Sequence, residues 1–275
     1  MAKVNFKYLC KIVRVNEIEN QLLGGRMSRK NKIKLTLDIA MAILFITFFK
    51  KNLISFKFHM ISGLVFGVFI LVHMILNRKW IVNISKRIFD RKIKFRTKFS
   101  YLLSLILFIS IIAIILSGMF IMKANTYDRV MFWKMLHFGA SYISLGLIGV
   151  HIGIYWNWVM NMFKKALKMN KSSKVSKVIS SLIILLILVF GSYTIYTQKY
   201  FTKTYTCLEY VVEHIKPQDI EGVNSYYGEA DKPSFINVAS TYGSIVAVFS
   251  IATYYCDKAF KKNKKHVLKT NKDIA

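Results

Sequence analysis

Long apolar segments alternate with short basic connections along most of the chain. A helix needs about 20 predominantly apolar residues to cross a bilayer, and its backbone groups must find their hydrogen-bond partners inside the segment. The pattern therefore predicts transmembrane helices in six places. These cover about residues 33–49, 53–76, 100–122, 131–160, 176–197 and 235–256. The first segment is short, and the last is rich in serine, threonine and tyrosine.

Composition agrees with this pattern. The 275 residues are 54% hydrophobic and include only two prolines, which is more apolar content than a soluble domain of this length needs. We expect an all-α membrane protein with lipid around it.

The formal net charge of +28 is distributed in a way that indicates topology. Lysine and arginine concentrate in residues 1–34, 77–99, 161–177 and the tail 257–275, which hold nine, nine, six and seven of them. Because basic connections mark the cytoplasmic side, the sequence predicts a multi-pass protein of the cytoplasmic membrane with both termini inside. The connections lack the mixed basic and aromatic stretches that bind nucleic acid, so we expect no nucleic-acid partner.

The two ends of the chain add separate regions. Residues 1–32 form a basic N-terminal segment, of which 1–26 are either a short cytoplasmic extension or a misassigned start. The C-terminal part, 161–275, is expected to supply two further helices, a basic tail and an extracytoplasmic segment at 198–234 that forms a small ordered cap.

A histidine pair with the same spacing occurs twice. The pattern H-x13-H-x6-W appears in two of the predicted helices, which suggests a duplicated helical hairpin. The residues are His59, His73 and Trp80 in the first copy, and His137, His151 and Trp158 in the second. Fourteen residues advance a helix by about 21 Å and return to nearly the same face. Since the two helices are expected to run parallel, His59 is predicted level with His137, and His73 with His151.

Two facing histidines on a helix bundle can hold one haem iron from both sides. The four histidines therefore predict two stacked haem b groups, ligated by the two level pairs, within a four-helix haem-binding bundle at 33–160. No C-x-x-C-H motif for covalent haem attachment is present. Glycines permit the close backbone approach that a porphyrin requires. Those expected beside the cofactor are Gly63, Gly67 and Gly149, with Gly139 and Gly146 also between the second pair.

Other interpretations of the histidines stay open. A membrane histidine can be a packing residue or part of a proton relay, and a non-haem metal site would need ligands from several helices. Asp38 is the one acidic residue inside a predicted helix, and it is expected near the level of His73 and His151. It could tune a cofactor, accept a proton or contact a quinone, or it could simply be hydrated near the interface.

The motif-bearing segments resemble the flavinylation-associated cytochrome family of the cytochrome b superfamily. They read KIKLTLDIAMAILF, FHMISGLVFGVFILVHMILNRKWIVNIS and MLHFGASYISLGLIGVHIGIYWNWV, within residues 30–160. The resemblance implies a di-haem b-type cytochrome that passes electrons across the membrane, often beside extracytoplasmic domains carrying covalent flavin. The flavin attachment pattern [ST]-G-A-[ST] does not occur here, so any flavin is expected on a partner protein.

The expected function is electron transfer between a quinol or cytoplasmic donor and an extracytoplasmic, flavin-bearing or other redox partner. The sequence leaves open whether the chain acts as a carrier or as a subunit of a membrane oxidoreductase. The alternative is a haem-free polytopic protein, a transporter or an assembly factor, with structural histidines inside.

Overall fold

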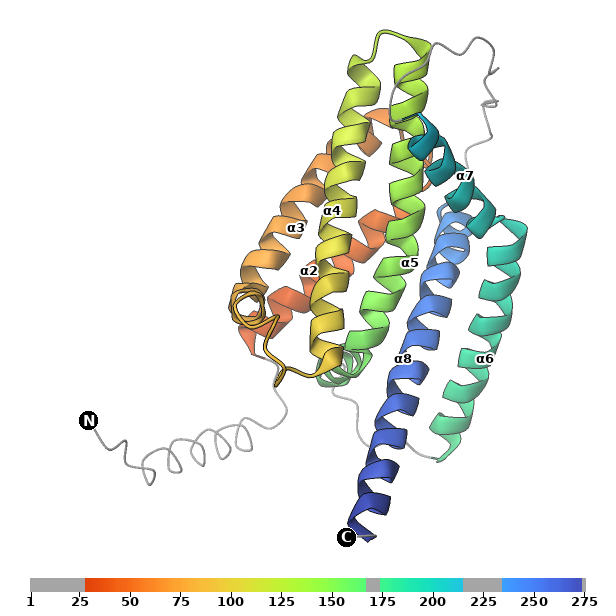
Figure 1. Ribbon diagram of the computed structural model, residues 1–275. Coiled ribbons are helices and arrows are strands. Elements are labelled where there is room, and N and C mark those ends of the chain that lie inside the picture. The colour runs from red at the N-terminus through yellow and green to blue at the C-terminus, as the bar shows by residue number, and fades with distance from the viewer. Residues whose placement is uncertain (1–27, 167–173, 215–233, 274–275) are drawn as a thin grey trace, which may run out of the picture.

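The computed structural model describes residues 28–166, 174–214 and 234–273, and these residues form seven helices and no strand (Figure 1). The helices are α2 (Arg29–Thr47), α3 (Phe56–Ser85), α4 (Phe95–Lys123), α5 (Tyr127–Ala166), α6 (Lys174–Thr197), α7 (Tyr200–Glu213) and α8 (Phe235–Asp273). The all-α prediction is confirmed over these ranges. The expectations for residues 1–26, and for 215–233 within the predicted cap, lie outside the described residues.

Five of the described helices are long and apolar enough to cross a bilayer, which makes the chain a multi-pass membrane protein. They are Phe56–Ser85, Phe95–Lys123, Tyr127–Ala166, Val178–Thr197 and Phe235–Lys261. Each overlaps one of the apolar segments predicted from the sequence. Most extend beyond those segments because the flanking polar residues continue the helical backbone.

The first predicted span differs from the prediction. Helix α2 forms, but it is not among the five helices apolar enough to span. Its 19 residues include Lys30, Lys32, Lys34 and Asp38, and charged groups are costly in hydrocarbon. Only its C-terminal half is strongly apolar, and there Phe45 is buried with its ring centroid 6.0 Å from that of Phe66 on α3.

Local sequence explains where the first two described helices begin. The Ser28 hydroxyl accepts a hydrogen bond from the Asn31 amide at 3.3 Å, and Ser55 accepts one from Phe58 at 3.1 Å. These are N-cap interactions, which satisfy amide groups that lack a partner in the first turn. They fix the entry points of α2 and α3, and so the height of His59 on its helix.

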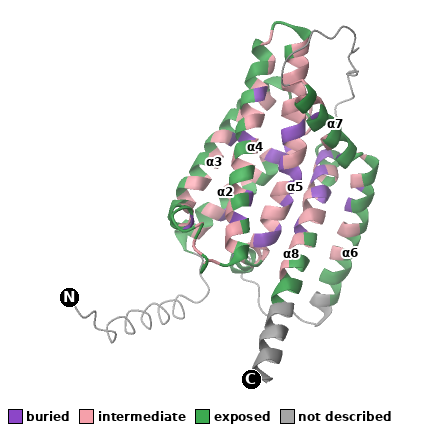
Figure 2. Cartoon of the chain, viewed as in Figure 1, coloured by how far each residue is buried: buried purple, intermediate pink, exposed green. Residues whose placement is uncertain are grey.

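Helix α5 lies at the centre of the fold. It packs against α4, α7, α8 and α2, and buried residues concentrate along it (Figure 2). Leu145 of α5 is fully buried in a core that also contains Phe66 of α3 and Ile245 of α8. The histidine helix α5 therefore joins the first helices of the chain to the C-terminal pair α6 and α8.

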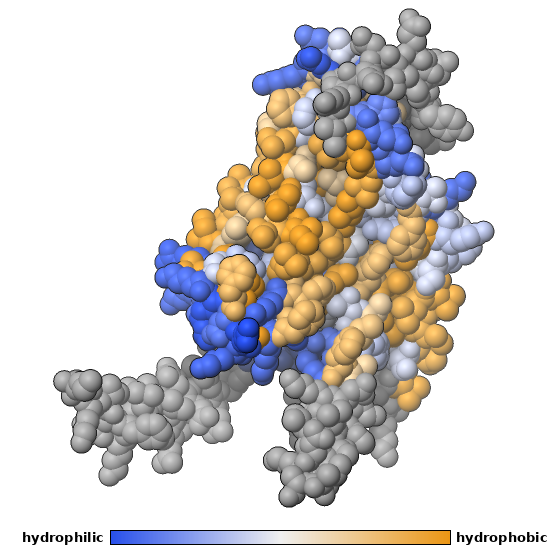
Figure 3. Space-filling view, in the orientation of Figure 1, coloured by the Kyte–Doolittle hydropathy of each residue, from blue (hydrophilic) through white to orange (hydrophobic). Residues whose placement is uncertain are grey.

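The outer surface of the helices is apolar, as contact with lipid requires. The view in Figure 3 shows a hydrophobic area over the middle of the molecule, with hydrophilic side chains gathered toward its ends. Exposed apolar residues on α3 and α6 include Val68, Ile75 and Leu186. Without lipid around them, such large apolar faces would remain in water.

Helix α7 occupies the start of the predicted outer segment 198–234, and it packs against α5. The Tyr200 hydroxyl donates a hydrogen bond to the Tyr142 carbonyl at 2.7 Å, and burial raises the pKa of Tyr200 to about 12. Another side of α7 carries an exposed apolar stripe of Phe201, Tyr205, Leu208 and Val212. An apolar stripe of this kind is typical of a helix that lies in the membrane interface.

Candidate functional site

The structure brings His59 and His137 together. Their ring centroids lie 6.1 Å apart, with 59° between the ring planes. This confirms that the two residues stand at the same level on α3 and α5. An iron atom between two imidazole nitrogens, at about 2 Å from each, would separate the ring centroids by roughly 6 Å. The spacing of this pair therefore suits a shared axial metal.

The backbones of the two helices that carry this pair stay apart. Helix α3 packs against α2 and α4, and α4 packs against α5, but no Cα atom of α3 lies within 8 Å of a Cα atom of α5. The two histidine helices thus face each other diagonally across a ring of four neighbours. A Cβ atom added to Gly63, one turn from His59, would meet nothing within 4 Å. There is open space beside the histidine on this side of α3.

The His137 ring is held by α4. Its Nδ1 lies 2.9 Å from the carbonyl oxygen of Ile114 and 3.3 Å from the hydroxyl of Ser117. A carbonyl can only accept, so the Ile114 contact places the proton on Nδ1 and leaves Nε2 with a free lone pair, the state that binds a metal. Gly118 of α4 lies beside this ring, and a Cβ there would be in van der Waals contact with it, 3.4 Å from His137 Cε1.

The second pair is organised around a carboxylate. His73 Nδ1 lies 2.8 Å from Asp38 Oδ1, with side chains that are 31% and 30% exposed. The expected proximity of Asp38 to this level is confirmed, and its partner is His73. His151 interacts electrostatically with both His73 and Asp38.

Two residues that sequence reasoning missed complete the polar network around His73. Asn77, one turn further along α3, donates to the His73 carbonyl at 2.9 Å. Its amide oxygen accepts a hydrogen bond from the Lys34 ammonium of α2. The available signal was the position of Asn77 four residues after His73, which puts both on one helix face.

Two histidine nitrogens are buried without a hydrogen-bond partner among the described residues: Nδ1 of His59 and Nδ1 of His151. A buried polar atom that lacks a partner is costly and calls for an explanation such as a missing water, ion or ligand. One histidine of each level pair is therefore fixed by a protein group, while the other has an unsatisfied nitrogen.

The glycines of α5 serve a different purpose from the one expected. A Cβ at Gly149 would lie 2.6 Å from Phe249 Cβ and 2.7 Å from the Val246 carbonyl oxygen, both on α8. Gly139 faces Cys207 of α7, and Gly146 faces the Tyr200 hydroxyl. These positions pack helices rather than a cofactor. Gly139 and Gly149 each lie two residues from a histidine, about 200° around the helix from it.

On α3, a Cβ at Gly67 would lie 3.0 Å from Ile115 of α4, so Gly67 also serves helix packing. Of the three glycines expected beside the cofactor, Gly63 alone borders open space.

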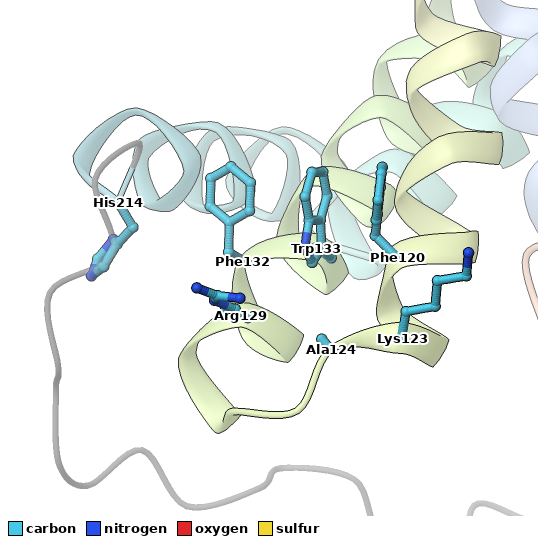
Figure 4. Close-up of a pocket in the computed structure, with 7 residues that line it drawn as sticks. All are labelled: Phe120, Lys123, Ala124, Arg129, Phe132, Trp133 and His214. Atoms are coloured by element: carbon cyan, nitrogen blue, oxygen red, sulfur yellow. The ribbon is translucent and has the colours of Figure 1, made fainter.

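Two hollows open near the end of the bundle that holds His59 and His137. The larger has a volume of about 510 Å³ and lies beside the turn between α4 and α5 (Figure 4). Its lining consists of Phe120, Lys123, Ala124, Arg129, Phe132, Trp133 and His214. The Phe120 and Trp133 rings stack with centroids 4.5 Å apart, and Trp133 is one turn from His137. The smaller hollow is lined by His59 together with residues of the turn between α2 and α3.

A metal site built only from protein ligands is not seen: the described residues contain no group of three or more histidine, cysteine, aspartate or glutamate side chains that could hold an ion. A haem needs just two protein ligands, because the porphyrin supplies the others. The paired histidines, their fixed tautomer and the orphaned ring nitrogens fit such a group.

No family model, curated protein or solved structure matches the chain. The functional assignment therefore depends on the geometry of the histidine pairs.

Proposed function

We propose that this chain is a membrane cytochrome that holds two haem b groups and carries electrons from one face of the membrane to the other. His59 and His137 would ligate one haem, and His73 and His151 the other. The observation that carries the proposal is the meeting of His59 and His137 at 6.1 Å between helices whose backbones stay apart. Bound haem would supply reversible one-electron chemistry.

The chain's own residues support this role in separate ways. Ile114 orients His137 through Nδ1, which leaves the other nitrogen of that ring for iron. Asp38 orients His73 through Nδ1, and iron at His73 Nε2 would replace the 3.4 Å contact that this nitrogen makes with Asn77 Nδ2. The two levels are about 21 Å apart along the helix axis, so the pair of sites covers much of the hydrocarbon core of about 30 Å.

The positions of the basic connections favour an orientation in which the His73 level faces the cytoplasm and the His59 level faces the outside. With the five apolar helices as the crossings, this orientation puts the C-terminus in the cytoplasm. A cytoplasmic N-terminus would require α2 to cross as well. The hollow with Lys123 and Arg129 then opens at the outer face. A redox partner there, flavin-bearing or not, would meet a cationic and aromatic surface close to His137. A quinol or a cytoplasmic reductase would face the other end.

One observation favours the haem-free alternative. Of the two hollows near the His59 end of the bundle, one is lined by none of the four histidines and the other by His59 alone. In a transporter or assembly factor, the pair of His73 and Asp38 would be a structural polar contact between α2 and α3. The two functions differ in whether the purified protein contains haem.

Haem content of single-histidine variants tests the proposal. We expect His59→Ala and His137→Ala each to lower the haem-to-protein ratio by half, with His73→Ala and His151→Ala doing the same for the second group. His214→Ala is the matched control, since His214 lies at the end of α7 and its Nδ1 contacts the Tyr210 carbonyl. Haem content that is unchanged in all four variants would refute the ligand assignment.

A further inference from the structure

The two histidine levels differ in the charge of the group that holds the ring. At the outer level, His137 Nδ1 lies 2.9 Å from the Ile114 carbonyl, a neutral acceptor. At the inner level, His73 Nδ1 lies 2.8 Å from the Asp38 carboxylate. The two rings are fixed by similar hydrogen bonds, but only one of them has a negative charge as its partner.

The carboxylate of Asp38 is directed at His73. Among the described residues its one ion-pair partner is His73. The nearest cation on its own helix is Lys34, one turn away, whose ammonium bonds the Asn77 amide oxygen. Lys34 and Asp38 interact electrostatically, so the lysine offsets part of the negative charge. The His73 and Asp38 side chains are both about one-third exposed, so solvent weakens the influence of the carboxylate charge further.

A carboxylate behind an axial imidazole has a defined consequence for a bound iron. It increases the electron donation of the imidazole, and its charge stabilises the oxidised, more positive form of the site. Hydrogen bonds to an axial ligand and local charge are among the factors that set haem potentials. A carbonyl acceptor exerts the same kind of influence more weakly because it carries no net charge.

We infer that the His73/His151 site has the lower reduction potential, that Asp38 sets this order, and that electrons therefore run from the cytoplasmic level to the outer level. This inference rests on the proposed function. Asp38 is a positioning and tuning residue, since it acts through His73. The membrane potential, negative inside, favours the same direction for a negative charge.

With a quinol as the donor, the electrons and protons balance. Oxidation of one quinol to quinone on the cytoplasmic side releases two protons and two electrons. Two successive one-electron transfers then reduce two one-electron acceptors at the outer face, or one two-electron acceptor such as a flavin on a partner protein.

A spectroscopic redox titration of the purified protein tests the inference. We expect two b-type components of different potential, and we expect His73→Ala to remove the lower one. Asp38→Asn keeps the size of the side chain and removes its charge. We expect Asp38→Asn to raise the reduction potential of the lower component. At a fixed solution potential near the wild-type midpoint of that component, the ratio of reduced to oxidised haem should rise about threefold or more. Asp38→Glu is expected to restore the low potential, and Lys34→Gln to lower it further.

Asp90→Asn is the matched control. Asp90 lies in the turn after α3, where it pairs with Arg87, so its loss removes one negative charge near the same end without touching His73. We expect no change in either component for this variant.

The possible failures can be told apart. If His73→Ala removes the higher-potential component, the inferred order is wrong. If Asp38→Asn leaves both potentials unchanged, Asp38 does not set the order. In both cases the cytochrome assignment stands. If Asp38→Asn loses haem, the Asp38→Glu and Lys34→Gln titrations and the His73→Ala assignment still decide the order. If the folded wild-type protein holds no haem, the proposed function and this inference both fail.

Discussion

The rings of His59 and His137 lie 6.1 Å apart although no Cα atoms of their helices come within 8 Å. Two long helices that pack directly fill the space between them with side chains from both surfaces. Here α3 and α5 meet at this level through histidines, and Gly63 borders open space one turn away. The relationship leads to predictions about the space itself, about the helices around it and about orientation in the membrane.

Filling the space beside Gly63 is expected to exclude a cofactor without disrupting the protein. A side chain at this position would meet no protein atom within 4 Å of its Cβ, so Gly63→Leu is expected to fold. The leucine would occupy the room that a porphyrin needs next to His59, so we expect about one haem per chain in place of two. The measurement is the haem-to-protein ratio after size-exclusion chromatography. Two haems in a folded Gly63→Leu protein would contradict this use of the space.

Gly149 is expected to behave in the opposite way. An alanine Cβ there would lie 2.6 Å from Phe249 Cβ and 2.7 Å from the Val246 carbonyl oxygen, so α5 and α8 must separate. Overpacking of this kind costs about 1–3 kcal/mol. We expect Gly149→Ala to lower the thermal midpoint of the protein in detergent, while the haem content of the folded fraction stays unchanged. An unaltered midpoint with reduced haem would instead place Gly149 beside the cofactor.

Cys207 is expected to resist alkylation. It is buried between α7 and α5, and burial raises the pKa of its thiol, with nearby Lys203 acting in the opposite direction. Because the thiolate is the reactive form, a raised pKa means less thiolate at any pH below it. In a chain whose only cysteine is Cys207, we expect the pH profile of maleimide labelling to lie at higher pH than for an otherwise cysteine-free Thr206→Cys control.

Equal labelling rates and equal pH profiles for the two single-cysteine proteins would show that α7 does not seal this position. Labelling of Cys207 that becomes fast only after denaturation would support the packing of α7 on α5.

Orientation in the membrane can be tested at two connections. The turn between α3 and α4 is basic and is expected in the cytoplasm, whereas the turn between α4 and α5 is expected outside. In a cysteine-free chain, we expect a membrane-impermeant maleimide to label Asn125→Cys in intact cells. Arg91→Cys is expected to react only in inverted vesicles. The reverse pattern would invert the orientation and reverse the assignment of inner and outer histidine levels.

The helices were predictable because each of the five apolar segments after the first is long enough to specify a buried or lipid-facing helix by itself. The apolar segment at 33–49 predicted α2 as a membrane-spanning helix, but the helix itself ends earlier, at Thr47. The lysines in its first turns make α2 less apolar than the five membrane-spanning helices. Helix α7 was anticipated only as an ordered cap, because an interfacial helix has no long apolar run.

The histidine geometry was partly predictable. The spacing of fourteen residues predicted which histidines share a level, and the meeting of His59 with His137 confirms the prediction for that pair. The spacing carries no information on which group lies behind each ring, so Ile114, Ser117 and Asn77 were missed. Their roles depend on how α3, α4 and α5 rotate against one another.

The role of the glycines of α5 was likewise only partly predictable from the sequence. Periodicity places Gly139 and Gly149 on a common side, about 200° from the neighbouring histidines, but it does not say which helix will lie against that side. The structure shows that α7 and α8 do. Tyr200, which anchors α7 to α5, had no signal in the sequence because its partner is a backbone carbonyl.

The most direct test of the central claim is a dithionite-reduced minus air-oxidised absorption spectrum of the purified, folded protein, with a haem assay against protein amount. The account predicts a b-type difference spectrum and two haems per chain. A folded protein without haem absorption would contradict it and would leave the histidine pairs as structural contacts of a haem-free membrane protein.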